Sequence, residues 1–377
     1  MLLRRTLGVL LLASLVLLGV FPSRMAPAAG TLPPLSYVSF ENTSVGCVAG
    51  PGVAFCTRDG GKQWGAIYRG RLTPHAVLFK GTKVWRLLAG TELLAPAGAG
   101  WSAVSPLSFR AVASLGRNLL GLKTDHKLVL SNDGGQKWTP VPLQNVEALN
   151  VHADIARVIE GKGVYESVTG QFFTRTGTIP NQHLSSLQMT FTGQKNGWLL
   201  ESMAQACAGQ MPYEVLGTID GGKVWKPVVA GASACWPNRM EPGHVGGPAG
   251  YPIHLATNGL AAGWLLVDQP GAGRMVLVRV TPQRFVWQLP VPHTGGNQVG
   301  DLEMVTLRSG WVVASTTHGV GVVFHLVEVG HRWELRQVAP WQFLGLSGGE
   351  AFKPVHAAGA ATASAVGTAS LRRRVQN

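Results

Sequence analysis

Residues 57–64 read TRDGGKQW, residues 131–138 read SNDGGQKW and residues 218–225 read TIDGGKVW. All three segments follow one pattern: Ser or Thr, any residue, Asp-Gly-Gly, any two residues and Trp. One match to so short a pattern would be weak evidence, but three matches in one chain indicate a repeated structural unit.

The spacing of the three segments gives the length of that unit. Asp59 and Asp133 are 74 residues apart, and Asp133 and Asp220 are 87 residues apart. Both separations are close to twice a unit of about forty residues, the length of one four-stranded blade of a β-propeller. Trp101 lies 37 residues from the Trp that ends each of the first two segments, so it marks a degenerate copy between them.

A second pattern precedes the eight-residue segments. A short, partly apolar run is followed after a few residues by a strand that begins with glycine, at Gly46, Gly197, Gly263 and Gly310. Together the two patterns divide the chain into seven units, which span residues 37–70, 71–105, 106–145, 146–182, 183–232, 250–292 and 300–342. The sequence therefore predicts an all-β fold, a single β-propeller of seven blades with four antiparallel strands each; eight blades are the alternative.

The composition agrees with this fold class. The chain has 377 residues, of which 49 are glycine, and only 14% of its residues are charged, which suits short strands joined by tight turns. We expect residues 31–345 to form the propeller. The tail at residues 346–377, rich in Ala, Gly, Ser and Thr, is expected to close the ring, to begin an eighth blade or to be loose.

Each eight-residue segment is predicted to be the turn between the third and fourth strands of a blade. Asp side chains commonly accept hydrogen bonds from nearby backbone N–H groups in turns, and glycine adopts the positive φ angles that such turns need. The tryptophan that ends each segment is expected to pack between neighbouring blades. These structural positions are Thr57, Asp59, Gly61 and Trp64 in the first segment, Ser131, Asp133, Gly135 and Trp138 in the second, and Thr218, Asp220, Gly222 and Trp225 in the third.

The pattern resembles the Asp-box, or BNR, repeat of sialidases, of the sortilin ectodomain and of the photosystem II stability and assembly factor family. In the order of its strands and segments the chain is most similar to the last family, over residues 37–341. Only three of the seven units hold the full segment. This resemblance implies a β-propeller that binds a protein partner at a membrane and is not an enzyme.

An enzymatic function lacks support in the sequence. A sialidase would need an Arg-Ile-Pro sequence before the first segment, which the chain does not have. Other glycosidases use two carboxylates that flank the scissile bond, but the spacing of the candidates Asp154, Glu160, Glu201 and Asp268 selects no pair. No catalytic residue is therefore assigned.

The N-terminus has the features of a signal peptide. Arg4 and Arg5 precede an uncharged, apolar stretch at residues 6–22, and alanines follow at positions 26, 28 and 29. We expect residues 1–30 to direct export across the cytoplasmic membrane, to an extracellular or membrane-surface location; an uncleaved anchor is the alternative. The net charge of +13 then favours an anionic surface or an acidic partner over nucleic acid, which an exported protein rarely meets.

Four cysteines in an exported chain predict two disulfides. Cys47 and Cys56 lie symmetrically about Pro51-Gly52, so a hairpin that turns there places them opposite each other, within reach of a disulfide. Because proline fits poorly in the favoured hairpin turns, a longer loop about the same centre is the alternative. Cys207 and Cys235 are then partners by elimination.

The fifth unit has two long loops that we expect to form a cap on one face of the ring. The first is an insertion at residues 203–213, which contains Cys207, and the second spans residues 230–252, which contains Cys235. Exposed aromatic and arginine side chains on ordered loops are typical of protein-binding sites. The candidate partner-binding residues of this cap are Tyr213, Trp236, Arg239 and His244.

The predicted function is that of an exported, non-catalytic binding or assembly scaffold for a membrane-associated or cell-envelope protein complex. A glycan-binding or glycan-hydrolysing, sialidase-like propeller is the alternative, and a sortilin-like peptide receptor is a weaker third. No cofactor and no metal site are expected, because the scattered histidines lack the paired spacing of zinc ligands. We expect a monomer with a protein partner and no nucleic acid partner.

Overall fold

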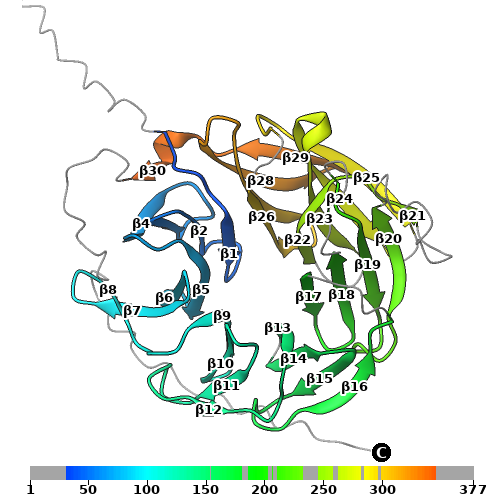
Figure 1. Ribbon diagram of the computed structural model, residues 1–377. Coiled ribbons are helices and arrows are strands. Elements are labelled where there is room, and N and C mark those ends of the chain that lie inside the picture. Colours follow the sequence, from blue (N-terminus) through cyan, green and yellow to red (C-terminus); the bar gives the residue numbers. More distant parts are fainter. Residues whose placement is uncertain are drawn as a thin grey trace, which may run out of the picture.

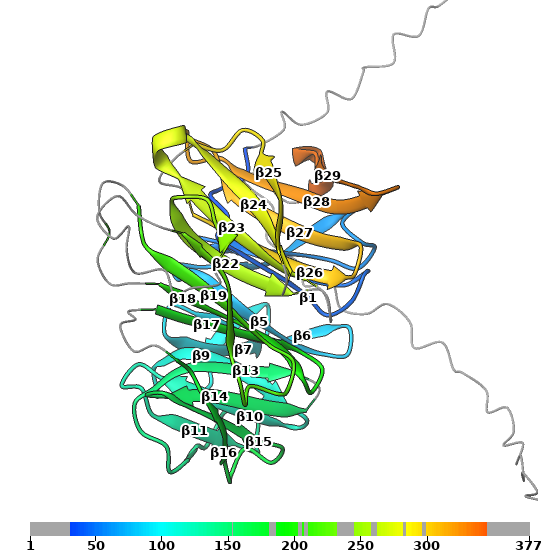
Figure 2. The ribbon, with the colours of Figure 1, turned by 90° about the vertical axis from the view of Figure 1, so that its right-hand side faces the viewer.

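The computed structural model describes residues 31–152, 154–180, 186–202, 206, 210–231, 245–257, 262–281, 284–295 and 299–344. Seven β-sheets form a ring around a central opening, seen along its axis in Figure 1 and from the side in Figure 2. Each sheet holds four consecutive antiparallel strands, which confirms seven four-stranded blades rather than eight. The predicted units agree with the blades, because the spacing of the repeats follows the length of one blade.

The first four blades have short strands joined by tight turns. Blade 1 comprises β1 (Tyr37–Phe40), β2 (Gly46–Gly50), β3 (Val53–Thr57) and β4 (Trp64–Arg69). Blade 2 comprises β5 (Pro74–Lys80), β6 (Lys83–Ala89), β7 (Glu92–Ala97) and β8 (Gly100–Ala103). Blade 3 comprises β9 (Phe109–Leu115), β10 (Asn118–Lys123), β11 (Leu128–Ser131) and β12 (Thr139–Pro140), and blade 4 comprises β13 (Val146–His152), β14 (Ile155–Glu160), β15 (Gly163–Ser167) and β16 (Thr174–Thr178).

The last three blades have longer strands. Blade 5 comprises β17 (Ser186–Thr192), β18 (Asn196–Ser202), β19 (Tyr213–Thr218) and β20 (Lys226–Gly231), with the short β21 (Val245–Gly246) added in parallel. Blade 6 comprises β22 (Tyr251–Thr257), β23 (Gly263–Gln269), β24 (Arg274–Thr281) and β25 (Arg284–Val291), with the 3-10 helix η1 (Pro270–Ala272) between its second and third strands. Blade 7 comprises β26 (Gly300–Thr306), β27 (Ser309–Ser315), β28 (Gly321–Val329) and β29 (Arg332–Gln337), and η2 (Pro340–Gln342) and β30 (Phe343–Leu344) follow it.

The glycine at the start of the second strand leaves room for a large side chain on the first strand. Gly46 pairs with Phe40, and Gly197 pairs with Phe191. A Cβ atom at Gly46 would lie 2.3 Å from the Phe40 ring, and one at Gly197 would lie 2.5 Å from the Phe191 ring. The recurring glycine is therefore a packing requirement between the two innermost strands of a blade.

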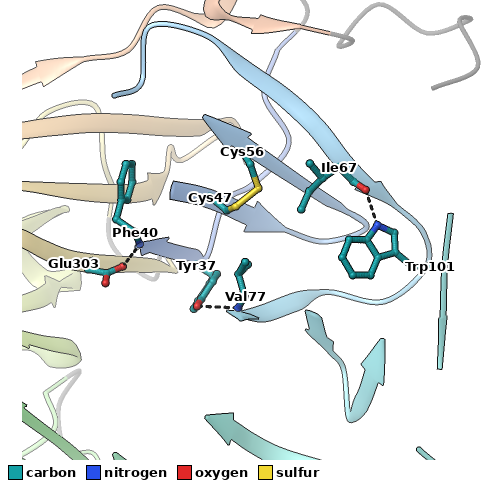
Figure 3. Close-up of a disulfide and its surroundings, with 8 residues drawn as sticks. All are labelled: Tyr37, Phe40, Cys47, Cys56, Ile67, Val77, Trp101 and Glu303. Atoms are coloured by element: carbon teal, nitrogen blue, oxygen red, sulfur yellow. Dashed lines mark hydrogen bonds between the residues drawn. A yellow bond between two sulfur atoms is a disulfide. The ribbon is translucent and has the colours of Figure 1, made fainter. Parts of the chain in front are cut away.

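The hairpin of blade 1 confirms the first predicted disulfide. Pro51 and Gly52 alone join β2 to β3, so Cys47 lies opposite Cys56, with their Cα atoms 4.0 Å apart, and the disulfide links them (Figure 3). Gly52 has a φ of 75°. Proline followed by a glycine of positive φ is the residue pair of a type II turn, so the two-residue turn accepts Pro51 and no longer loop is needed.

The three Asp-Gly-Gly segments form the same turn in blades 1, 3 and 5. In blade 1, Thr57 Oγ1 donates to Asp59 Oδ1 (2.8 Å) and accepts from Gly61 N (2.9 Å). The N–H groups of Lys62 and Gln63 both donate to Asp59 Oδ1 at 3.0 Å. Burial by itself would raise the pKa of the Asp59 carboxyl, but these hydrogen bonds outweigh it and hold the pKa below its ordinary value. Blades 3 and 5 repeat the same bonds.

Each of these turns rests on the blade that precedes it in the ring. A Cβ atom at Gly61 would lie 2.2 Å from Trp311 of blade 7, and one at Gly135 would lie 2.6 Å from Leu93 of blade 2. Gly61 also has a φ of 84°, which a residue with a side chain rarely adopts. The second glycine of the segment thus serves both the turn and the close approach of two blades.

The tryptophans that end the segments lie between blades. Trp64 is fully buried, and the centre of its ring lies 5.6 Å from that of Trp311 in blade 7. Trp225 packs in the apolar cluster between blades 4 and 5, and Trp138 packs against the cluster between blades 2 and 3. The core of this protein is therefore a set of separate apolar layers between neighbouring blades.

Blade 4 holds a further turn of this kind that the sequence pattern did not reveal. Gly170 N donates to Ser167 Oγ (2.8 Å), and Gly170 has a φ of 78° and packs against Leu130 of blade 3. Thr169 stands at the position of the aspartate, and Phe173 packs in the cluster between blades 3 and 4 where a tryptophan would lie. The signal was hidden because the segment is one residue shorter and lacks both Asp and Trp.

Both ends of the described chain close the ring between blades 7 and 1. Before β1, the carbonyl of Leu32 accepts a hydrogen bond from Gly321 N of blade 7 (3.0 Å), and Leu35 is fully buried. After blade 7, β30 pairs in parallel with β4 of blade 1 (Figure 1). The predicted signal peptide at residues 1–30 and the tail at residues 346–377 lie outside the described residues.

Candidate binding site in the central cavity

The central opening contains a cavity of about 880 Å³. Its wall is formed by the innermost strands of five blades, β1, β13, β17, β22 and β26, and by the residues that directly follow β1 and β26. This volume lies within the range of about 300–1,000 Å³ that is typical of ligand-binding pockets. Each of the five strands contributes polar groups to the wall.

Two carboxyl groups on β26 bind the backbone of blade 1. Asp301 Oδ2 accepts a hydrogen bond from Val38 N (2.9 Å), and Glu303 Oε2 accepts one from Phe40 N (2.7 Å), which Figure 3 shows. The two acids are two residues apart on one strand, so both side chains lie on the same face and reach the same neighbouring strand. They link the first blade to the last one at the wall of the cavity.

A histidine and an aspartate join blades 6 and 7. His254 Nδ1 lies 2.8 Å from Asp301 Oδ1, and the His254 side chain is 39% exposed to the cavity while that of Asp301 is 7% exposed. Burial by itself would lower the pKa of His254, but the charge of Asp301 and the hydrogen bond to it outweigh burial and raise the pKa above its ordinary value. The pair therefore favours an imidazolium beside a carboxylate.

Glu303 holds its proton more tightly than an ordinary glutamate. Burial raises its pKa to about 8; the hydrogen bond from Phe40 N opposes the shift, and the charge of Asp301 adds to it. Burial also raises the pKa of Glu41, which directly follows β1 at the same cavity. At neutral pH, Glu303 is therefore mostly protonated and uncharged.

Side chains also link the inner strands of the other neighbouring blades. Tyr37 Oη accepts a hydrogen bond from Val77 N of blade 2 (3.1 Å; Figure 3). Gln188 Nε2 of blade 5 donates to the Ile253 carbonyl of blade 6 (2.8 Å), and Leu255 N donates back to Gln188 Oε1 (3.1 Å). Side-chain bonds thus join the inner strands of blades 5, 6, 7, 1 and 2 in series.

The titratable residues of the described cavity wall differ in kind from those of the chain as a whole. The wall contains three carboxylic acids, Glu41, Asp301 and Glu303, two histidines, and neither lysine nor arginine. The chain as a whole has 32 Lys and Arg against 19 Asp and Glu. The basic residues are therefore kept out of the cavity, where hydrogen-bond acceptors predominate.

The structure places the glycosidase candidates of the sequence away from this cavity. Asp154, Glu160, Glu201 and Asp268 are not part of its wall. Glu201 and Asp268 are buried within blades 5 and 6. The acids that do line it were missed, although the alternation of Asp301 and Glu303 with apolar neighbours on an inner strand is a readable signal that both face the channel.

The prediction that Tyr213 is an exposed, partner-binding residue is wrong. It begins β19, its side chain is only 4% exposed, and its hydroxyl donates to the Pro248 carbonyl (2.9 Å). The ring packs in the apolar cluster between blades 5 and 6, so burial of a large aromatic side chain decides its position. Trp236, Arg239, His244, Cys207 and Cys235 lie outside the described residues.

The described parts of the two long loops do meet. Met211 N donates to the Gly250 carbonyl (2.9 Å), and Gly247 N donates to the Ala230 carbonyl (2.8 Å). The end of the first loop is therefore fixed to the end of the second. This contact joins the described ends of the two loops beside blade 5.

No family model matches the chain, and no curated protein matches its sequence. Similar solved structures include YCF48 from Cyanidioschyzon merolae, with 15% identity and a TM-score of 0.51 over 78% of this chain and 96% of that chain. They also include the BP39L lectin from Burkholderia pseudomallei (12%, TM-score 0.52, 82% and 100%) and YCF48 bound to a D1 peptide (15%, TM-score 0.47, 79% and 95%). The shared feature is the β-propeller fold.

The described part of the chain holds neither a membrane-spanning helix nor a cluster of metal ligands. In that part of the chain, no helix is long and apolar enough to span a membrane. No group of three or more His, Cys, Asp or Glu side chains there is arranged to hold a metal ion.

Proposed function

We propose that the protein is an exported, non-catalytic scaffold that binds a protein partner at the membrane or the cell envelope. The proposal rests on one observation: the carboxyl groups of Asp301 and Glu303 at the cavity are bonded to neighbouring blades. Asp301 binds Val38 N and His254, and Glu303 binds Phe40 N. Carboxyl groups held by such bonds form part of a rigid wall that can recognise a partner. A glycosidase instead needs two carboxyl groups that flank the scissile glycosidic bond.

A rigid wall favours binding because little conformational freedom is lost when the partner arrives. The inner strands of blades 5, 6 and 7 are fixed to one another by Gln188 and by the His254–Asp301 pair. Loops positioned by such a scaffold are the usual place for recognition. The predicted cap of the fifth unit, to which the sequence assigns Trp236 and Arg239, is the second part of the proposed binding surface.

The proposed location rests on the sequence of the first thirty residues, which has the order of a signal peptide. The net charge of +13 supports the same location, because the membrane surface and the cell envelope present anionic groups. The cavity itself is acidic, so contact with an anionic surface would use the outer faces of the ring.

Affinity purification of the tagged protein from its own solubilised membranes, followed by mass spectrometry, tests the proposal. We expect a partner in stoichiometric amount that is lost from a double variant of the cap, Trp236→Ala with Arg239→Ala. Phe172→Ala is the matched control, because Phe172 is 79% exposed and lies in a turn of blade 4. Recovery of no specific protein, or equal recovery with all three proteins, would count against a scaffold.

One observation favours the alternative of a glycan-active propeller. Glu303 is a carboxyl group held protonated near neutral pH in an open cavity, which is the state that a glycosidase requires of its general acid. A glycan array and a panel of chromogenic glycosides would identify this function. Turnover that is lost in Glu303→Gln would replace the scaffold with an enzyme.

A further inference from the structure

Two wall residues on β13 and β17 hold side-chain oxygen atoms that lack a hydrogen-bond partner in the described part of the chain. Within the described part of the chain, Asn150 Oδ1 on β13 and Thr192 Oγ1 on β17 are buried without a hydrogen bond. Both residues belong to the cavity wall, and Figure 1 shows β13 across the central opening from β26. Buried polar atoms are nearly always hydrogen-bonded in native proteins, so these two oxygen atoms are acceptors without a donor.

The acidic side of the cavity calls for a donor as well. Both carboxyl oxygens of Asp301 already accept hydrogen bonds, from Val38 N and Leu302 N, and Oδ1 also contacts His254. The carboxyl groups of the wall that remain for a ligand are those of Glu303 and Glu41. A ligand that supplies N–H donors and a positive charge therefore suits the acidic side of the cavity. Ammonium and guanidinium groups are donors only, and their bonds to carboxylates are the stronger, charge-assisted kind.

We propose that the central cavity binds the basic side chain of a lysine or an arginine, presented by an extended segment of the protein partner. This inference rests on the proposed function, because it names the chemistry by which the scaffold would recognise its partner. A cavity of about 880 Å³ has room for such a side chain together with part of the segment that presents it. The exposure of His254 shows that the wall is open to solvent, so a segment can enter.

The site couples binding to the release of a proton. The groups that face Glu303 are Asp301 on its own strand, Tyr37, Ser39 and Glu41 from blade 1 and, through Asp301, His254 from blade 6. A cation placed beside Glu303 favours its ionised form and displaces the proton that it holds at neutral pH. Affinity for the basic side chain therefore rises with pH from 6 to about 8, by at most tenfold for each pH unit while one proton is released, and it levels off at higher pH, where Glu303 is already ionised.

Isothermal titration calorimetry with short capped peptides tests the inference. The probes are four heptapeptides of sequence Gly-Ser-Ala-Xaa-Ala-Ser-Gly, in which Xaa is Lys, Arg, Gln or Glu. We expect the Lys and Arg peptides to bind on the order of tenfold or more tightly than the Gln peptide, as for a charge-assisted hydrogen bond. Titration at pH 7 in buffers of different ionisation enthalpy should show about one proton released for each peptide bound.

Two variants locate the site. Glu303→Gln keeps an oxygen for the bond from Phe40 N, and we expect it to bind the basic peptides more weakly and with little dependence on pH. Glu41→Gln removes a negative charge from the same wall. Because Glu41 is exposed, this variant should fold normally, so the site can still be tested if Glu303→Gln folds poorly. The matched control is Glu147→Gln, an exposed acid on β13 outside the cavity wall, which should bind as the unchanged protein does.

The outcomes separate this inference from the proposed function. Equal affinity for the Lys, Gln and Glu peptides, or basic-peptide binding that the cavity variants leave unchanged, would overturn the inference. If affinity purification still recovers a partner through the cap in that case, the scaffold function stands without it. Basic-peptide binding that is lost in Glu41→Gln and Glu303→Gln, but not in Glu147→Gln, supports both.

Discussion

Replacement of Trp311 with alanine should open the ring between blades 7 and 1. Trp311 is 3% exposed and stacks on Phe40 of blade 1, with ring centres 4.8 Å apart and the planes 5° from parallel. Its ring also meets Trp64 edge-on at 5.6 Å and stacks on His325 at 4.4 Å. Truncation of a buried tryptophan to alanine costs about 3–5 kcal/mol, and the lost aromatic pairs place this case at the upper end of that range.

The assay is thermal and urea unfolding of Trp311→Ala beside the unchanged protein. A loss of about 5 kcal/mol corresponds to a fall in Tm of roughly 10 °C, at about 2 °C per kcal/mol for a domain of this size. Phe172→Ala is the matched control, because Phe172 is an aromatic residue that is 79% exposed, and its loss should change stability by less than about 0.5 kcal/mol. Equal effects of the two substitutions would refute the view that the aromatic layer closes the ring.

Three further predictions follow from the same geometry. Removal of the Cys47–Cys56 disulfide, by reduction or by Cys→Ser at both positions, should lower stability by about 2–3 kcal/mol, measured by urea unfolding with and without reductant, because the loop that it closes is short. Gly61→Ala should lower Tm in thermal unfolding, because its Cβ atom would lie 2.2 Å from Trp311 and its φ of 84° is strained for alanine. Glu303, whose pKa burial raises to about 8 in the folded state, contributes stability that is fully present below pH 4.5 and is lost as pH rises through 8. Unfolding measured from pH 5 to pH 9 should therefore show stability falling with pH more steeply in the unchanged protein than in Glu303→Gln, and parallel curves would contradict this.

The local features of the fold could be predicted from the sequence because each depends on residues that are close together in the chain. The turn at Thr57–Gly61 is made by bonds within five residues, and the Cys47–Cys56 pair follows from one hairpin. The prediction of an exposed Tyr213 failed because the neighbouring sequence fits either a loop or a strand. Tyr213 ends a loop and begins a strand, and only its packing between blades 5 and 6 shows that it is buried.

By itself, the sequence determined the β-propeller, the approximate bounds of its repeated units and the first disulfide, since these depend on a repeat and on turn chemistry that are local in the chain. The structure decided that the ring has seven blades and not eight. Only the tertiary structure decided the composition of the central cavity. Asp301 meets Val38, which lies 263 residues away, and it meets His254 of the neighbouring blade. No local pattern marks such pairs, because the closure of the ring is what brings the first blade against the last and places their inner strands around one opening.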